Sequence, residues 1–315
     1  MGKIAVVGSI NMDVVNRVER HPLPGETVSG LETAYIPGGK GANQAVAAAR
    51  AGAQVLMIGA VGRDPFGGPL VEALGKAGVD TARVLEKKGT SGMAFITVDA
   101  HGENNIILSS GANGKLSVED MEAGLIDAAA GDGGVGLGGV LLQNEIPWET
   151  TSAAVRRART LGATVYLNPA PARKVEDEVL ALVDVLVVNE TEAAAISGIK
   201  VDSREHAEAA ADWLLGRGVR EVIVTLGAAG VVYASKEGER VSVPAFRVEA
   251  VDTTAAGDTF IGAYAADRDR GASVQEALQW ANAAAAIAVT RPGAQSSIPS
   301  ADEVDRWLEI KSSSI

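Results

Sequence analysis

The segment of the chain with the clearest chemical potential is residues 250–260, which ends just after Asp258 and runs into an apolar helical pattern. The residues before Asp258 are small and include Gly257, so the first backbone N–H groups of the predicted helix are left uncovered. Uncovered N–H groups at a helix start suit an anion such as phosphate. An aspartate beside them can accept a proton from a hydroxyl that attacks a phosphoryl group. The alternative is that Asp258 only caps the helix, which does not require the small residues in front.

A second candidate is the glycine-rich segment 37–44, which opens an Ala-rich helical pattern. Its adjacent glycines allow a ligand to approach the backbone closely. The amide of Asn43 both donates and accepts hydrogen bonds, as recognition of a polyhydroxyl ligand requires. The segment is not a Walker A loop, because Lys40 is followed by Gly41 rather than by Ser or Thr. A tight loop without a ligand explains the glycines as well.

Polar residues also follow two predicted strands. Asn11 and Asp13 come after the apolar run at residues 4–7, at the carboxyl edge where open α/β sheets bind ligands, and together they can hold neighbouring sugar hydroxyls. Asn189 and Glu192 follow a later strand and begin a helix. Their oxygen atoms suit Mg²⁺ held through water. An N-cap Asn with a capping-box Glu explains the same spacing equally well.

The elements that must position these residues alternate between short apolar runs and Ala-rich helical segments, which is the pattern of parallel strands joined by helices. Strands without polar alternation are buried on both faces. The predicted strands are Ile4–Val7, Val55–Ile58, Val140–Leu142, Thr164–Leu167, Val185–Val188 and Val222–Thr225. The predicted helices are Gly41–Ala51, Pro69–Ala77, Thr151–Leu161, Glu205–Arg217 and Gly257–Asp267. Thr225, Gly227 and Gly230 end the last strand and suit close approach to a nucleotide.

Two stretches, within residues 12–37 and 90–111, break this rhythm. The first contains the turn at 22–25, and the second reads as a hairpin with its turn at 99–102. They form either a small separate sheet, serving as a lid over a cleft or a dimer contact, or an extension of the main sheet.

Two segments are predicted to lie outside any site. The glycine-rich run at 131–139 precedes a strand, whereas a dinucleotide-binding loop follows one, so we interpret the run as a flexible surface loop. The tail at 311–315 is predicted to be disordered.

Composition limits the chemistry that is available. The 315 residues include no Cys and three scattered His, which excludes thiolate chemistry and leaves oxygen ligands for any metal. The net charge of −12 repels nucleic acid, and no apolar run reaches the length of a membrane span. We therefore expect one α/β domain over residues 1–310, with a cytoplasmic location and neither nucleic acid nor a membrane as partner.

Taken in order, these motifs resemble the ribokinase family of carbohydrate kinases from about Ile4 to Pro299. The segments 38–49 and 252–260 are similar to the two family signatures. The segments 8–13, 168–172 and 286–295 resemble the ribose-specific branch more than the fructose, nucleoside or keto-deoxygluconate kinases.

The resemblance implies a three-layer fold, with a central, mostly parallel sheet between helices and a small β-sheet lid. It implies that Asp258 is the catalytic base and that Ala255, Ala256 and Gly257 form the anion hole. It further implies that Asn11, Asp13, Gly39, Lys40, Asn43 and Glu145 hold the sugar. The ATP site would comprise Asn189, Thr225, Gly227, Gly230, Gly257 and Asn282, with Glu192 ordering Mg²⁺ and its waters. A monovalent cation, usually K⁺, would be held by Asp252, Thr254, Ala288, Arg291, Gly293 and Ser297.

The activity that the resemblance implies is transfer of the ATP γ-phosphate to the 5-hydroxyl of D-ribose, in a homodimer formed through the lid. Deoxyribose, a nucleoside or another pentose are alternative acceptors, and a non-catalytic sugar or nucleotide sensor is the alternative outside enzymes. The chain departs from the family pattern at 131–139, where the run is long, and at 143–145, which makes the position of Glu145 less secure. It also carries additional charge at 267–270, near the end of the helix that Asp258 begins.

Overall fold

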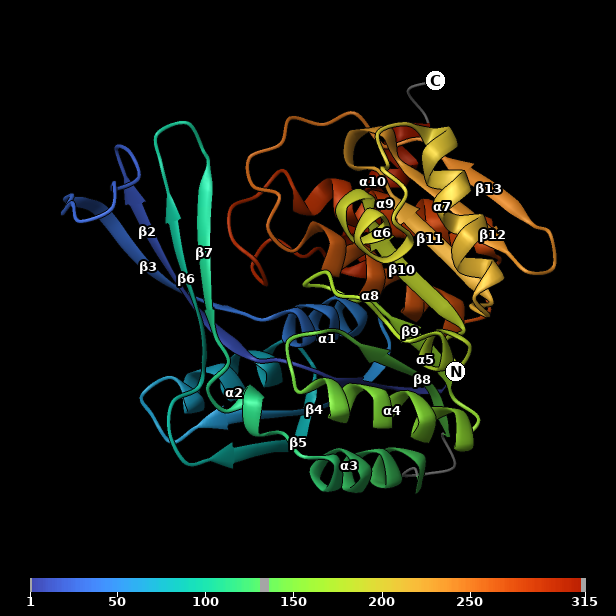
Figure 1. Ribbon diagram of the computed structural model, residues 1–315, viewed down its shortest axis with the longest axis horizontal. Coiled ribbons are helices and arrows are strands. Elements are labelled where there is room, and N and C mark those ends of the chain that lie inside the picture. Colours follow the sequence, from blue (N-terminus) through green and yellow to red (C-terminus); the bar gives the residue numbers. More distant parts are fainter. Residues whose placement is uncertain (1, 131–135, 313–315) are drawn as a thin grey trace.

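The computed structural model describes residues 2–130 and 136–312. The chain forms three layers, a nine-stranded sheet between two layers of helices, and a second, four-stranded sheet stands to one side of them (Figure 1). The predicted α/β fold class is therefore confirmed.

The main sheet has the strand order β13-β12-β11-β10-β9-β8-β1-β4-β5. Its strands are β1 (Lys3–Val7), β4 (Gln54–Gly62), β5 (Asp80–Lys87), β8 (Leu137–Leu142), β9 (Thr164–Leu167), β10 (Val185–Asn189), β11 (Glu221–Thr225), β12 (Val231–Ser235) and β13 (Arg240–Val243). The pairings of β12 with β11 and with β13 are antiparallel, and the other pairings are parallel. All six predicted strands are present. The three that were not predicted, β5, β12 and β13, lie at the two edges of the sheet.

Helices cover both faces of the main sheet. One face carries α1 (Lys40–Arg50), α2 (Gly67–Lys76), α8 (Ala256–Asp269), α9 (Val274–Ala288) and α10 (Ala301–Ser312), and the other carries α3 (Val118–Ala130), α4 (Trp148–Thr160), α5 (Asp177–Leu180), α6 (Glu190–Ser197) and α7 (Arg204–Gly216). Alternate residues of β1 enter the two cores, Ile4 and Val6 on one side and Ala5 and Val7 on the other. This two-sided burial explains why the strands read as continuous apolar runs.

Close packing of α1 against α8 brings the two predicted signatures together. At Gly262 in α8, a Cβ atom would lie 2.5 Å from the carbonyl oxygen of Gln44 and 2.6 Å from the Cβ of Ala47. Only glycine therefore allows the helices to approach this closely. The small separation places the first turns of α1 and α8 side by side.

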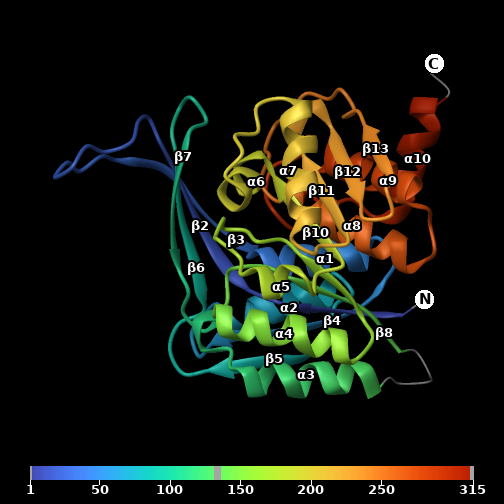
Figure 2. The same cartoon turned by 45° about the vertical axis from the view of Figure 1, so that its right-hand side comes forward.

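The second sheet has the order β3-β2-β6-β7 and comprises β2 (Asn11–Val18), β3 (Gly30–Gly38), β6 (Gly92–Val98) and β7 (Asn104–Ser109). Figure 2 shows its long strands rising away from the helical layers. The two irregular stretches thus form a separate sheet, and the alternative in which they extend the main sheet is wrong. The edge strand β7 is exposed along its whole length.

Two expectations about loops need correction. Residues 137–139 belong to β8 rather than to a loop, and 131–135 lie outside the described residues. Lys311 and Ser312 close α10 instead of belonging to a disordered tail, whose remaining residues also lie outside the description. Within the described residues, no helix has the length and apolar character that a membrane crossing requires.

Candidate functional site

Asp258 lies in the first turn of α8 with its side chain buried at 6% exposure. Its Oδ1 accepts a hydrogen bond from Nε2 of Gln44 at 2.9 Å, and its Oδ2 accepts one from Nδ2 of Asn43 at 3.1 Å. The N-cap position of α8 is Ala255, and no side chain caps this helix. The interpretation of Asp258 as a helix cap is therefore wrong, because its carboxylate faces α1 instead.

The start of α8 is strained and uncovered. Ala255 has φ 60°, and it is the only residue other than glycine with a positive φ in the described parts of the chain. This left-handed conformation costs an alanine about 1–2 kcal/mol. Ala255, Ala256, Gly257 and Asp258 all line a cavity of about 180 Å³. The backbone N of Ala256 already donates to the carbonyl of Thr253 at 3.2 Å, so the N–H groups that follow it in the first turn are the ones that suit this cavity to an anion.

Lys40 also lines the cavity, and acidic groups surround it. The negative charge of Asp258 is the main reason that the pKa of Lys40 is raised, and Glu145, Glu192 and Asp13 act in the same direction. Burial, with the charges of Glu145 and Asp258, raises the pKa of Asp13 to about 7, although Lys40 opposes this shift. These side chains therefore share one electrostatic environment.

Glu145 joins the first strand of the second sheet to the start of α1. Its Oε2 accepts hydrogen bonds from Oγ of Ser9 at 2.6 Å, the backbone N of Lys40 at 3.1 Å and Nδ2 of Asn11 at 3.5 Å. Gly39, the N-cap of α1, has φ 90°, and a Cβ there would lie 2.7 Å from the backbone N of Asn11. The departure from the family pattern at 143–145 thus leaves Glu145 beside its predicted partners.

Polar atoms without partners face this region. Oδ1 of Asn43 is buried and has no hydrogen-bond partner within the described chain, so it can accept a donor from a ligand. Nearby, a cavity of about 230 Å³ lies between β7 and the main body, lined in part by Asn11, Ser109, Asn113 and Glu145. The predicted sugar-binding residues therefore come together.

Asn189 and Glu192 form the capping box that their spacing allows. The backbone N of Glu192 donates to Oδ1 of Asn189 at 2.8 Å, and the backbone N of Asn189 donates to Oε2 of Glu192 at 3.0 Å. Burial raises the pKa of Glu192. The hydrogen bonds confirm the interpretation of these two residues as a capping box. Both residues also line the cavity at Asp258, so the position of Glu192 is compatible with binding metal-bound water as well.

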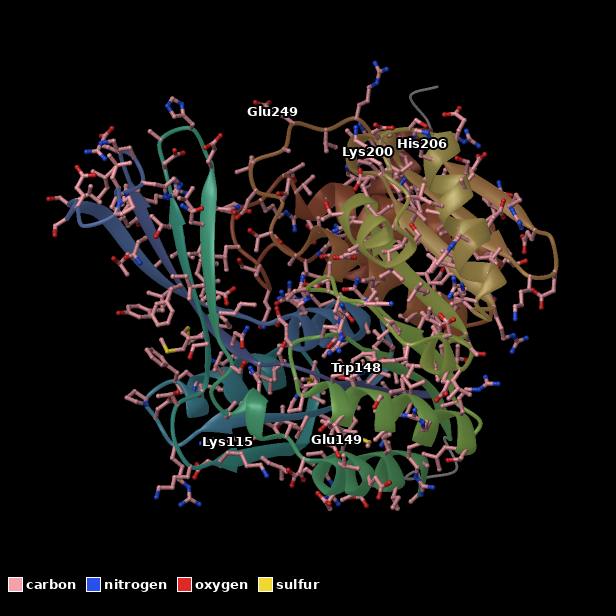
Figure 3. The ribbon with its side chains drawn as sticks, in the orientation of Figure 1. Lys115, Trp148, Glu149, Lys200, His206 and Glu249 are labelled. Atoms are coloured by element: carbon pink, nitrogen blue, oxygen red, sulfur yellow. The ribbon has the colours of Figure 1, made fainter. Side chains whose placement is uncertain are left out.

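A larger cavity of about 610 Å³ adjoins the 180 Å³ cavity at Asp258. The walls of both include Thr225, Thr253, Ala256 and Gly257. Gly227, Gly230 and Asn282 line it, as predicted, together with the apolar residues Val231, Phe260, Ala285 and Val289. Its size and apolar walls suit a planar ring system. Part of the wall comes from the loop between β13 and α8, whose exposed Glu249 extends away from the helical layers (Figure 3).

The predicted cation ligands lie on the loop before α8 and on a segment from Ala288, the last residue of α9, to Ser297, and Asp252 joins the two. Its Oδ1 accepts from the backbone N of Thr254 and its Oδ2 from that of Gly293, both at 2.9 Å. Burial opposes ionisation here, but these hydrogen bonds outweigh it and lower the pKa of Asp252. The backbone N of Arg291 donates to the carbonyl of Ala288 at 3.1 Å.

Two of these predicted ligands have their side chains engaged elsewhere. The guanidinium of Arg291 pairs with Glu303, and Oγ of Ser297 donates to the carbonyl of Ala294 at 2.8 Å. Arg291 could therefore contribute only its backbone carbonyl to an ion, whereas Oγ of Ser297 keeps lone pairs that can bind one.

Other metal sites find no support in the described residues. They contain no group of three or more His, Asp or Glu side chains that could hold a metal ion. His206 lies on the outer surface near Lys200, and its Nδ1 is 2.6 Å from Oδ1 of Asp202 (Figure 3).

The buried polar residues at the site that were not predicted include Ser9, Gln44, Asn113 and Asn168. Asn168 directly follows β9, so the rule that identified Asn11 and Asn189 would also have found it. Gln44 stands out only as a polar residue in an Ala-rich helix. Nδ2 of Asn113 donates to Oδ1 of Asn11 at 2.7 Å, a contact between distant segments that no local pattern reveals.

Comparisons with known proteins agree with this geometry. Residues 1–301 match the pfkB family of carbohydrate kinases. The chain is 41% identical over 310 residues to a ribokinase of Haemophilus influenzae, covering 97% of this chain and 98% of that protein. It is 40% identical over 309 residues to a deoxyribokinase of Salmonella typhi, covering 98% and 99%. The structure of an Arabidopsis thaliana ribokinase complexed with ribose and ATP is similar, with a TM-score of 0.87 and 31% identity over 98% of this chain and 99% of that one.

The environment of Asp13 leads to a prediction about stability. An aspartate with an unfolded pKa near 3.8 and a folded pKa of about 7 keeps its proton in the folded state at pH values where the unfolded chain has lost it. Stability therefore falls as pH rises between these values. We expect Asp13→Asn, which cannot ionise, to be more stable than the wild type at pH 8, by up to about 4 kcal/mol, and nearly equal to it at pH 4.

Urea unfolding at several pH values measures this difference, with the exposed Asp80→Asn as the control. A stability difference that does not change with pH would contradict the assignment.

Proposed function

Because the chain belongs to the pfkB family of carbohydrate kinases, and so transfers a phosphoryl group to a sugar hydroxyl, we propose that its donor is ATP and its acceptor the 5-hydroxyl of D-ribose. The observation that carries the proposal is the position of Asp258. Its carboxylate lies at the uncapped start of α8, where the walls of the small polar cavity and the larger apolar cavity meet.

The two cavities suit different parts of ATP, and the proposed sugar site lies beside them. The apolar cavity near Asn282 has the chemistry for adenine, and the uncovered N–H groups at the start of α8 have the chemistry for the γ-phosphate. On the other side of Asp258, the unpartnered Oδ1 of Asn43 can accept a bond from a sugar hydroxyl. Asn11, Asp13, Gly39, Lys40 and Glu145 would complete the sugar site. The ribokinase solved with ribose and ATP supports this pair of substrates.

In the proposed reaction, the oxygen of the sugar 5-hydroxyl attacks the γ-phosphorus while Asp258 takes the proton of that hydroxyl. The bond between that phosphorus and the bridging oxygen to the β-phosphate breaks, and ADP leaves with the bonding electrons. The backbone N–H of Gly257 stabilises the charge on the transferred group, whereas that of the predicted Ala256 would first have to leave the carbonyl of Thr253, to which it donates at 3.2 Å. Lys40, beside the same cavity, adds a positive charge.

Cations are expected because the cleft is acidic. Glu192 can order Mg²⁺ through water, since it lines the cavity. The carboxylate of Asp252, with backbone carbonyls of the other predicted ligands, would supply oxygen donors of the kind that bind K⁺. A cation there would offset negative charge beside the start of α8.

Deoxyribose is the second candidate acceptor, because relatives named deoxyribokinase are as similar to the chain as several ribokinases. One experiment addresses both candidates and the base: ADP release measured with pentoses, hexoses and nucleosides. We expect the wild type to turn over ribose best. Asp258→Asn should lose kcat by a factor of about 10²–10⁴, as general-base removal does, while still binding ribose and ATP.

The control is Asp267→Asn, which lies at the other end of the same helix and pairs with Arg270. Turnover by Asp258→Asn at the wild-type rate would remove the proposed base. Ligand binding without ADP release from any sugar would instead favour the sensor.

The K⁺ proposal predicts that turnover in K⁺ exceeds turnover in tetramethylammonium at equal ionic strength, because the large organic cation cannot enter the loops. Asp252→Asn should lose most of this activation. Steady-state rates in the two salts provide the measurement, and equal rates would count against the ion site.

The homodimer proposal rests on the exposed apolar side chains of the second sheet. Leu31, Tyr35, Phe95, Ile106, Ile107 and Leu108 are between 42% and 70% exposed, and β7 is an open edge strand. The strand register places Tyr35, Phe95 and Ile107 on one face of the sheet and Ile106 and Leu108 on the other, and a second copy of the sheet would cover the face that carries Ile107. We expect Ile107→Lys to sediment as a monomer and the wild type as a dimer. Ile126→Lys, a charge at an exposed position on α3, serves as the control, and an unchanged mass for Ile107→Lys would contradict the interface.

A further inference from the structure

We propose that Gln44 is a positioning residue for the phosphoryl transfer, because its amide fixes the rotation of the Asp258 carboxylate and selects Oδ2 as the oxygen that accepts the proton. The inference rests on the proposed role of Asp258 as the base. Gln44 lies in α1, next to Asn43, and its side chain is fully buried at 0% exposure.

The direction of each hydrogen bond follows from the chemistry of the partners. A carboxylate only accepts, so the Nε2 of Gln44 must face Oδ1 of Asp258, at 2.9 Å. Its Oε1 then points the other way and accepts from Nε2 of Gln143 at 2.6 Å. Reversing the Gln44 amide would set an oxygen against the carboxylate and an NH₂ group against another NH₂ group. The carboxylate of Asp258 therefore determines the orientation of Gln44, and the orientation of Gln143 follows from that of Gln44.

The second proton of the Gln44 amide continues the network toward the metal side of the cleft. Nε2 of Gln44 lies 3.5 Å from Oδ1 of Asn168. Asn168 in turn uses its own NH₂ group to donate to the carbonyl of Val187 at 2.9 Å and to Oε2 of Glu192 at 3.2 Å. The network thus has a carboxylate at each end, Asp258 and Glu192, with amides oriented toward both.

This arrangement leaves the two oxygens of Asp258 in different situations. Oδ1 is held by Gln44, whose side chain has no access to solvent. Oδ2 has Asn43 as its partner, and Oδ1 of Asn43 still lacks one. A sugar that donates a different hydroxyl to Asn43 would leave its 5-hydroxyl free to donate to Oδ2. Gln44 therefore acts on the chemical step through the base and does not contact either substrate.

The test compares Gln44→Leu with Gln143→Leu, its fully buried neighbour in the same network. Gln44→Leu removes a donor to a carboxylate, and we expect kcat to fall about 10- to 100-fold, with KM for ribose and ATP changed less than about threefold. The acid limb of the kcat pH profile should move to higher pH, because losing a donor disfavours the ionised carboxylate. Gln143→Leu keeps the donor to Asp258, so its kcat should stay within about threefold of the wild type.

If Gln44→Leu does not fold, Gln44→Leu combined with Gln143→Leu replaces it, since the double variant leaves no stranded amide. A kcat and a pH profile like those of the wild type, or a kcat loss matched by KM increases for both substrates, would overturn the inference. Asp258→Asn is assayed in parallel. If Asp258→Asn keeps its turnover, the proposed function itself fails; if only the glutamine variants behave like the wild type, this inference alone fails.

Discussion

A single ammonium group facing several carboxylates is the interaction on which the cleft depends. Asp258, Glu145, Glu192 and Asp13 all act on Lys40, and together they outnumber it. Basic side chains therefore cannot be the main attraction for a polyphosphate here. In the proposed function, the attraction would come from neutral backbone N–H groups at the start of α8 and from cations that accompany the ligand. In a chain with net charge −12, this arrangement would attract phosphate to the start of α8.

The same cleft requires α1 and α8 to pack unusually closely, and small residues make this possible. Gly262 lets the backbone of α8 approach that of Gln44, so the first turns of both helices contribute to one site. The left-handed Ala255 is a local cost of the same arrangement, since it starts α8 at the position where its N–H groups face the cavity. The left-handed Ala255 destabilises the start of α8, and the packing of α1 against α8 in an Ala-rich core stabilises the same pair of helices.

The sequence allowed the main sheet and the ends of its strands to be predicted, because parallel strands buried on both faces have a strong apolar signal and polar residues just after them face one edge. Asn11, Asn189 and Thr225 were found in this way. The sequence could not decide whether Asn189 and Glu192 cap a helix or face a cavity, and they do both. It also could not separate the second sheet from the first, because strand pairing depends on contacts such as β2 with β6, which are distant along the chain. Gln44 was missed because its importance comes from Asp258, 214 positions away.

The choice of an amide at Gln44 follows from the charge problem at Lys40. A lysine or arginine at this position would neutralise Asp258 and weaken it as a base, and an acidic residue would add one more charge to an already acidic cleft. A leucine would leave the inner oxygen of a buried carboxylate without a donor. An amide supplies the donor and keeps the charge unchanged. It also donates to Asn168, whose own amide donates to Glu192. Neutral amides therefore connect the two carboxylates that we propose to serve the sugar and the metal, and this requirement explains why α1 interrupts its alanines with adjacent polar residues at Asn43 and Gln44.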